Sequence, residues 1–140
     1  MPIKAENKDL YPADWPAISI AAKERAGWAC QQPGCSAKQY DVGWWNGPRW
    51  IRIHGPCATY KEARQRAADE HFSRFGDERG EYKILVIVLT TAHLNHDPTD
   101  CRPENLAAMC QRHHLAYDHD HHRANAWATR RAKSGTLELF

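Results

Sequence analysis

The sequence predicts a small α+β fold centred on a strand, a loop and a helix that follow one another in the chain. The strand is predicted by an apolar, β-branched stretch over residues 83–91, and the loop by polar residues and two prolines over residues 93–104. Residues 105–117 have the composition of a helix. A chain of 140 residues can bury one modest core, so we expect a single domain over residues 1–140.

Four further segments have a predicted structure. Residues 1–14 are polar and contain prolines, which predicts a loose arm. A short helix is expected over residues 18–27, where Gly27 would end it. Charged residues at helical spacing predict a helix over residues 59–75, and a final helix is expected over residues 124–133.

Residues 38–82 are expected to form an insertion in this plan. Within it, residues 38–56 hold three tryptophans among glycines and prolines, which predicts an irregular loop with short strands. Tryptophans in such loops pack against the protein more often than they bind ligands. The alternative is that the tryptophans dock a protein partner.

The composition sets limits on the class of protein. Hydrophobic residues make up 42% of the chain and charged residues 26%, as in ordinary globular proteins. We find no apolar run of about 18 residues and no secretory signal, so we expect a cytoplasmic protein with no membrane partner. The formal charge of +2 neither requires nor excludes a nucleic-acid partner. Five cysteines without an export signal argue against a disulfide framework.

Two closely spaced ligand pairs predict a structural zinc site. Cys30 and Cys35 flank a turn that contains proline and glycine, and Cys110 lies three positions before His113. Tetrahedral structural zinc is commonly held by two such pairs. The alternatives are that the cysteines are ordinary buried residues, or that the adjacent His114 takes the place of His113.

A second group of polar residues surrounds the predicted strand, loop and helix. His93 follows the strand, Asn105 ends the loop, and His114 lies four residues before Asp118 on the helix. That spacing puts an imidazole and a carboxylate on one helix face, where they can share a divalent cation. A histidine of near-neutral pKa can deprotonate water, whereas Asn105 can orient that histidine, fix the loop or cap the helix.

The stretch from residue 91 to residue 118, about 28 residues, resembles the HNH endonuclease motif. The three positions that give the motif its name match His93, Asn105 and His114. The runs Pro-Glu-Asn-Leu over residues 103–106 and Cys-Gln-Arg-His-His over residues 110–114 are especially similar. The upstream pair of cysteines resembles the other half of the family's zinc knuckle.

This resemblance implies a ββα-metal fold and hydrolysis of phosphodiester bonds, usually in DNA. It implies that His93 is the general base, that Asn105 positions this base or supports the metal, and that His114 is a ligand of a catalytic cation. The cation would be Mg²⁺, Mn²⁺, Ni²⁺ or Zn²⁺, beside a structural Zn²⁺. Many such proteins are bacterial or phage-encoded, and cleavage of both strands would favour a homodimer.

Two positions depart from the family pattern. Many members place an acidic residue or a histidine just before the base, as a ligand of the cation, and this chain has Ala92 there. Asp118 is the best substitute, followed by His96 and Asp97. The second departure is His113, where the usual zinc ligand is cysteine. Three thiolates and one imidazole are an ordinary zinc set.

Basic residues near the end of the sequence are candidate phosphate contacts, although a solvated helix face explains them equally well. These candidates are Arg112, Arg123, Arg130, Arg131 and Lys133. The expected function is therefore metal-dependent cleavage of DNA. The alternative is an inactive, zinc-stabilised module that binds DNA or a protein.

Overall fold

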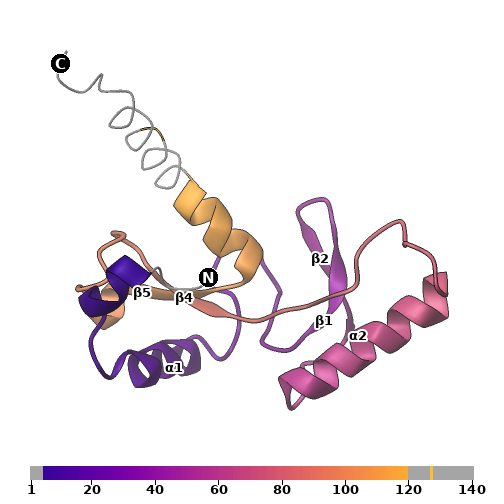
Figure 1. Cartoon of the computed structure of the whole chain (residues 1–140), viewed down its shortest axis with the longest axis horizontal. Coiled ribbons are helices and arrows are strands. Elements are labelled where there is room, and N and C mark those ends of the chain that lie inside the picture. The colour runs from indigo at the N-terminus through magenta and orange to yellow at the C-terminus, as the bar shows by residue number, and fades with distance from the viewer. Residues whose placement is uncertain (1–4, 120–126, 128–140) are drawn as a thin grey trace.

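The computed structural model describes residues 5–119 and residue 127, and these residues form a small mixed α+β fold. Two halves lie side by side (Figure 1). The metal half comprises helix α1, strands β4 and β5, the helix over residues 111–119 and the turn between Cys30 and Cys35. The hairpin half comprises strands β1, β2 and β3 and helix α2. No helix in the described part of the chain has the length and apolar character needed to cross a membrane.

The metal half is built on two antiparallel strands followed by a helix. Strands β4 (Thr90–His93) and β5 (Leu106–Met109) pair with His93 opposite Leu106, and the helix over residues 111–119 begins two residues after β5. The predicted helix over residues 105–117 is therefore wrong over its first part. Leucine, alanine and methionine favour helix locally. All four β5 residues are nevertheless buried, and pairing with β4 overrides that preference.

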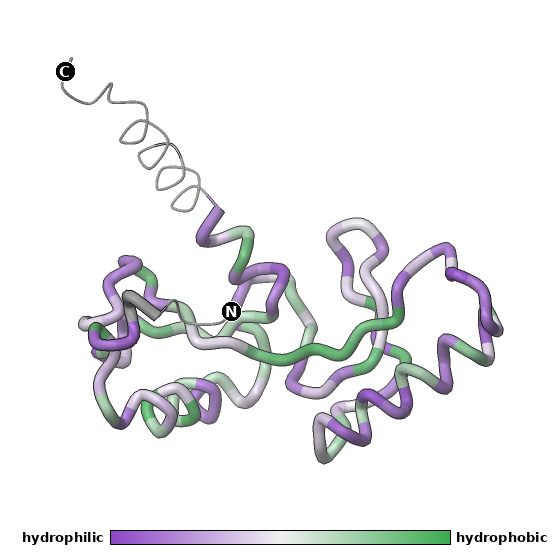
Figure 2. Tube along the Cα trace, in the orientation of Figure 1, coloured by the Kyte–Doolittle hydropathy of each residue, from purple (hydrophilic) through white to green (hydrophobic). Residues whose placement is uncertain are grey.

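The predicted strand over residues 83–91 is divided between two sheets. Its first part is β3 (Leu85–Val86), which pairs with β1, and its last residues belong to β4. In between, Ile87 exchanges backbone hydrogen bonds with residues 40 and 41 at 2.8 and 2.9 Å. This apolar stretch joins the two halves, and Figure 2 shows it as a continuous hydrophobic segment. Ile87 and Leu89 are almost completely buried there.

Helix α1 (Trp15–Arg25) packs on β4 and β5. It begins three residues before the predicted start because a proline is tolerated in the first helical turn. Across this contact, the Ser19 and Thr91 hydroxyl oxygens lie 2.8 Å apart and share a hydrogen bond. Residues 1–14 are predicted to be a loose arm, whereas Ala5–Leu10 form the 3-10 helix η1.

Most of the hairpin half is formed by residues 38–82, the predicted insertion. Strands β1 (Val42–Asn46) and β2 (Arg49–His54) form an antiparallel hairpin, and the sheet order is β2-β1-β3. Helix α2 (Tyr60–Phe75) packs on β1 and β3 and confirms the helix predicted over residues 59–75. The Thr59 hydroxyl caps it by accepting a hydrogen bond from the Glu62 N–H at 3.1 Å.

One core connects the halves, and several of its members come from the segments that carry the predicted metal ligands. Its buried residues are Cys30, Ala37, Trp50, Ile87, Leu89, Ala92, Ala107, Ala108, Met109 and Cys110. The helix predicted over residues 124–133 lies outside the described residues except for residue 127, which is helical.

Candidate metal centre and the adjoining histidine cluster

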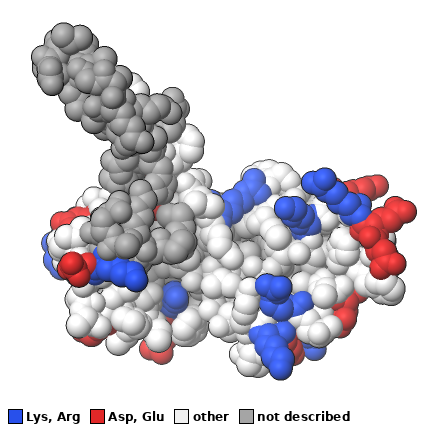
Figure 3. All heavy atoms as spheres, in the orientation of Figure 1, with Lys and Arg blue, Asp and Glu red and all other residues white. Residues whose placement is uncertain are grey.

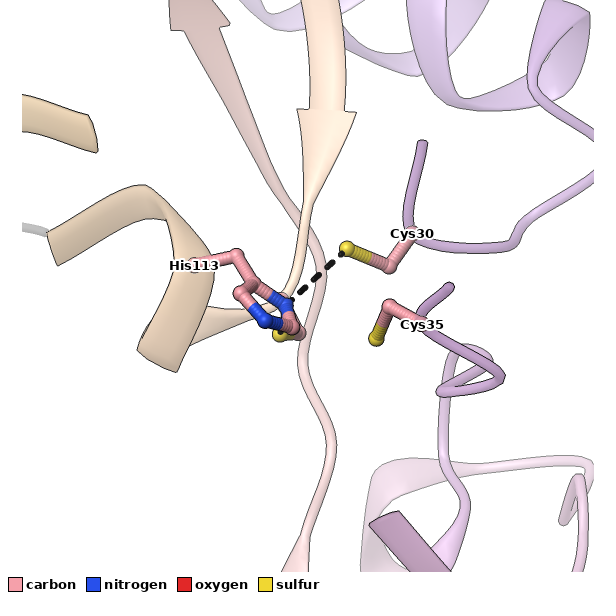
Figure 4. Close-up of side chains that lie close together, drawn as sticks. Cys30, Cys35 and His113 are labelled. Atoms are coloured by element: carbon pink, nitrogen blue, oxygen red, sulfur yellow. Dashed lines mark hydrogen bonds between the residues drawn. The ribbon is translucent and has the colours of Figure 1, made fainter. Parts of the chain in front are cut away.

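The four predicted zinc ligands converge from three segments. Cys30 and Cys35 come from the turn after α1, Cys110 directly follows β5, and His113 lies in the first turn of the next helix. Figure 4 shows Cys30 and Cys35 on one side, facing His113 on the other. All four ligand atoms lie within 4.8 Å of one another.

The donor atoms fit a tetrahedral zinc ion. His113 Nδ1 is 3.7 Å from Cys30 Sγ and 3.2 Å from Cys110 Sγ. With Zn–S bonds of about 2.3 Å and Zn–N bonds of about 2.1 Å, the sulfur–nitrogen edge of a regular tetrahedron is about 3.6 Å. The two distances lie on either side of that value. This Cys₃His set can therefore hold a metal ion, and its chemistry suits structural zinc.

The thiols of this set differ in how readily they ionise. A hydrogen bond from the Cys110 thiol lowers the pKa of Cys30 well below the ordinary thiol value. The same hydrogen bond, together with burial, raises the pKa of Cys110, and burial raises the pKa of Cys35. A cation among the three sulfurs would favour ionisation of the remaining two thiols.

Backbone hydrogen bonds hold the cysteine turn to its surroundings. The Cys30 N–H donates to the Ala37 carbonyl at 2.9 Å. The Gln31 N–H donates to the Ala108 carbonyl, and the Gln31 side-chain oxygen accepts from the Ala108 N–H, each at 2.8 Å. Both ligand pairs are thus fixed to β5, one through hydrogen bonds and the other through the chain itself.

The ligand set also touches the hairpin half. The Trp45 ring meets the His113 ring edge-on, with centroids 5.7 Å apart. The Arg112 guanidinium lies 4.7 Å from the centroid of the same tryptophan ring and donates to the Gly47 carbonyl at 2.6 Å. Arg112, a predicted phosphate contact, therefore also ties the helix to the β1–β2 turn. The other four predicted contacts, Arg123, Arg130, Arg131 and Lys133, lie outside the described residues.

His93 ends β4 under an aromatic cover. Trp15 stacks on its imidazole with ring centroids 4.8 Å apart and planes at 23°, and Tyr11 approaches edge-on at 5.7 Å. Burial lowers the pKa of His93, whereas the carboxylates of Asp97 and Asp100 oppose that shift. The imidazole is therefore neutral at physiological pH and can accept a proton.

Asn105 fixes the loop that follows His93. Its amide nitrogen donates to Asn95 Oδ1 at 2.9 Å and to the Asp100 carbonyl at 2.7 Å, and its oxygen accepts from the Asn95 N–H at 3.1 Å. The backbone carbonyl of Asn105 accepts from the Leu94 N–H at 2.8 Å. Every side-chain contact thus reaches the loop rather than the imidazole itself.

His114 and Asp118 face each other across one turn of the helix. His114 Nε2 is 3.0 Å from Asp118 Oδ2, and His114 Nδ1 is 2.5 Å from the Thr90 hydroxyl. His96 Nε2 lies 3.0 Å from the other carboxylate oxygen, Asp118 Oδ1. His114 and Asp118 are buried, as is Ala92, which precedes the base position.

Three contacts escape sequence reasoning. Tyr11 lies in the predicted loose arm and Trp15 lies between that arm and the helix predicted over residues 18–27, and nothing nearby in the sequence points to His93. Thr90 lies in a strand, and no sequence motif indicates that its hydroxyl contacts His114.

In the described part of the chain, the Cys₃His set is the only group of three or more histidines, cysteines or carboxylates with ligand atoms all within 4.8 Å of one another. Comparison with family models, with characterised proteins and with solved structures found no match to this chain.

Proposed function

We propose that this protein is a metal-dependent endonuclease of the HNH type, which hydrolyses DNA phosphodiester bonds with His93 as the general base. The main support is the order of elements and residues: His93 ends β4, Asn105 precedes β5, and His114 lies on the helix that follows. This order agrees with the resemblance of residues 91–118 to that motif.

The environment of His93 suits a general base. Burial under Trp15 lowers its pKa, so the imidazole stays neutral and can take a proton from water at neutral pH. Asn105 holds the loop after the base in one conformation through three side-chain hydrogen bonds. In this role Asn105 is a positioning residue.

His114 and Asp118 are the proposed ligands of the catalytic cation. A divalent cation there would neutralise charge on the scissile phosphate and on the leaving oxygen. The Thr90 hydroxyl engages His114 Nδ1 and leaves Nε2 directed toward Asp118. Such a contact on the far ring nitrogen is the usual way in which a histidine ligand is oriented.

The Cys₃His set would align this centre. His113 belongs to the zinc set, and its neighbour His114 belongs to the proposed cation site. A zinc ion that fixes the start of the helix to β5 would therefore fix the position of His114 relative to β4. Zinc in such small domains contributes directly to the free energy of folding.

Exposed cations support DNA as the substrate. Figure 3 shows Lys and Arg side chains gathered over the hairpin half, with acidic side chains at its outer end. Contacts with phosphates would position a duplex without reading its sequence. A homodimer would allow both strands to be cut. Exposed basic residues of β2 and α2 are Arg49, Arg52, Lys61, Arg64, Arg66 and Arg74.

The second candidate is a DNA-binding module without catalysis. Ala92 favours it, because that position lacks a cation ligand. The cover of Trp15 and Tyr11 over His93 also favours it, because a reacting water must reach the imidazole. This module would bind DNA with an affinity that falls steeply with salt, and would cut nothing.

The test is cleavage of supercoiled plasmid by zinc-loaded protein with Mg²⁺, Mn²⁺, Ni²⁺ or no added cation. We expect conversion to nicked or linear DNA only with an added cation. The His93→Ala variant should lose about 100-fold or more of the rate, since general-base catalysis contributes at least that much. The matched control is His71→Ala on α2.

Cleavage by His93→Ala at the wild-type rate would remove His93 from the mechanism. Salt-dependent binding by both proteins, with no cleavage in any cation, would establish the binding module instead.

A further inference from the structure

The loop between β4 and β5 brings a second imidazole to the proposed cation site. His96 Nε2 lies 3.0 Å from Asp118 Oδ1, and His114 Nε2 lies 3.0 Å from Asp118 Oδ2. The carboxylate is thus contacted by one imidazole at each oxygen. The two histidines come from different elements, 18 positions apart in the sequence, so the pairing is a product of the fold.

We propose that His96 is a ligand of the divalent cation, together with His114 and Asp118, and takes the place of the ligand that Ala92 does not provide. The location of this cation rests on the proposed nuclease function. Its binding, however, can be measured without cleavage.

The backbone directs His96 back toward the helix. His96 has a φ of +61°, in the left-handed region that histidine adopts more readily than most side chains. Its N–H donates to the His93 carbonyl at 3.0 Å, which closes a turn directly after β4. A bulky residue in this conformation is retained where the surrounding structure dictates it, and such positions concentrate at functional sites.

Two neighbouring helix residues hold the imidazole. The Tyr117 ring stacks on the His96 ring with centroids 5.2 Å apart and planes at 19°, and the next residue is Asp118. The Tyr117 hydroxyl donates to the Leu94 carbonyl, at the start of the same loop. The helix therefore fixes the loop and the ring of His96 together.

Other acidic side chains of the loop are engaged elsewhere. Asp97, the competing candidate, is exposed, and its Oδ1 accepts hydrogen bonds from the Thr99 N–H and hydroxyl at 3.0 and 2.6 Å. Asp100 accepts a bidentate pair of hydrogen bonds from the Arg102 guanidinium, at 2.8 Å to each carboxylate oxygen. Asp118 is the carboxylate that both imidazoles contact.

The donor set has a consequence for cation preference. Two imidazoles and one carboxylate favour transition metals such as Mn²⁺, Ni²⁺ and Zn²⁺ over Mg²⁺, which prefers oxygen ligands. Because the two imidazoles touch different oxygens of Asp118, one ion bound by all three groups requires His96 to approach His114. Cation binding should therefore shift the loop that carries His96.

The experiment is a titration of zinc-loaded full-length protein with Mn²⁺, in which electron paramagnetic resonance measures the free Mn²⁺. We expect one Mn²⁺ site in the wild type. His96→Gly should weaken that site about tenfold or more, because glycine keeps the left-handed backbone but lacks the imidazole. The matched control is Asp97→Asn, which keeps the oxygen that accepts from Thr99 and should bind Mn²⁺ within about twofold of the wild type.

A second measurement needs no variant. Substoichiometric Mn²⁺ should broaden the imidazole C–H proton resonances of His96 and His114 in the wild-type spectrum and leave those of His71 on α2 sharp. Sharp His96 resonances, or wild-type Mn²⁺ affinity in folded His96→Gly protein, would overturn the proposal.

The two proposals can fail separately. Mn²⁺ binding that depends on His96, without cleavage of any DNA, would leave the cation site in place and remove the nuclease. Cleavage that depends on His93, together with a Mn²⁺ affinity that does not change in His96→Gly, would support the nuclease and remove His96 from the cation site.

Discussion

The two halves of the molecule are stabilised in different ways. In the metal half, the paired strands contribute small side chains to the core, among them Ala92, Ala107 and Ala108. In the hairpin half, Trp44 stacks on Tyr82 with ring centroids 4.0 Å apart. Because burial stabilises roughly in proportion to apolar area, these alanines gain less from packing than larger side chains would. A cross-link through four metal ligands can supply what these small side chains do not.

The hairpin half instead has a buried carboxylate at its centre. Asp41 is completely buried, and its Oδ2 contacts Arg52 Nη2 at 2.8 Å, the Lys38 N–H at 2.9 Å and Trp50 Nε1 at 3.2 Å. One oxygen thus connects β2 to the segment before β1. We therefore expect the metal half to depend on an ion bound by its Cys₃His set, and the hairpin half to depend on aromatic packing and this ion pair.

Removal of zinc should have the largest effect. Chelation under reducing conditions, or Cys110→Ser, should unfold the metal half, because the ligand set contributes free energy comparable with the whole stability of a small domain, about 5–15 kcal/mol. Hydrogen exchange should show lost protection in β4, β5 and residues 111–119, and retained protection in α2.

The control is Cys57→Ser, since Cys57 lies outside the ligand set. Equal loss of protection in both halves would show that the hairpin half depends on zinc as much as the metal half does.

Loss of the Asp41 carboxylate should have the next largest effect. Asp41→Ala removes the carboxylate from the Arg52 guanidinium, which is one-third exposed and keeps its hydrogen bond to the Ser36 carbonyl. We expect a loss of about 3 kcal/mol in the free energy of unfolding, at the low end for a broken buried pair. Chemical denaturation measures it. Asp69→Ala, at an exposed position on α2, should cost under about 0.5 kcal/mol, and equal costs would contradict the central role of Asp41.

A methyl group at Gly43 should disturb the hairpin half by a smaller amount. A Cβ there would lie 2.0 Å from the Ile51 carbonyl oxygen and 2.9 Å from Trp50 Cζ2, so the β1–β2 pair must separate. We expect Gly43→Ala to cost about 2–3 kcal/mol by thermal denaturation. Gly47→Ala meets no atom within 4 Å and bears only the strain of its positive φ, about 1 kcal/mol. Reversal of that order would contradict the close approach.

The smallest effect concerns α1, which packs on the metal half. Burial lowers the pKa of His93, so the acid limb of the pH–rate profile for cleavage should lie below the ordinary histidine value of about 6.5. Removal of its stacking partner in Trp15→Leu reduces that burial and should move the acid limb of the pH–rate profile upward.

The groups that raise the pKa of His93 are Asp97, Asp100 and Asp118, whereas His114 lowers it. An unchanged acid limb in Trp15→Leu would mean that the aromatic cover does not set the pKa of the base.

Local patterns in the sequence predict the metal half in part. The spacing of Cys30, Cys35, Cys110 and His113 predicts the observed cluster, because short-spaced ligand pairs carry their own signature. The strand–loop–helix order is correct, but β5 is missed. Its residues favour helix locally, and only pairing with β4 makes them a strand.

The hairpin half and the cover over His93 depend on contacts between distant residues. The charge pattern predicts α2 closely, whereas the hairpin over residues 42–54 is expected only as short strands in a loop. Trp15 reaches His93 from 78 positions away in the sequence. The sequence offers Asp118, His96 and Asp97 as substitutes for the missing cation ligand, but it gives no reason to pair Asp118 with His96. The turn at His96 and its stacking on Tyr117 arise only in the folded chain.

The most direct test of whether a metal ion stabilises the metal half is to detect that ion in the purified protein. Native mass spectrometry of protein purified without added metal should find at least one zinc ion per chain, and the cobalt-substituted protein should show thiolate-to-cobalt charge-transfer absorption that is reduced in Cys30→Ser. That result would establish the Cys₃His site on which the proposed alignment of His114 with β4 rests. A folded chain that carries no metal and takes up neither zinc nor cobalt at these cysteines would contradict the account.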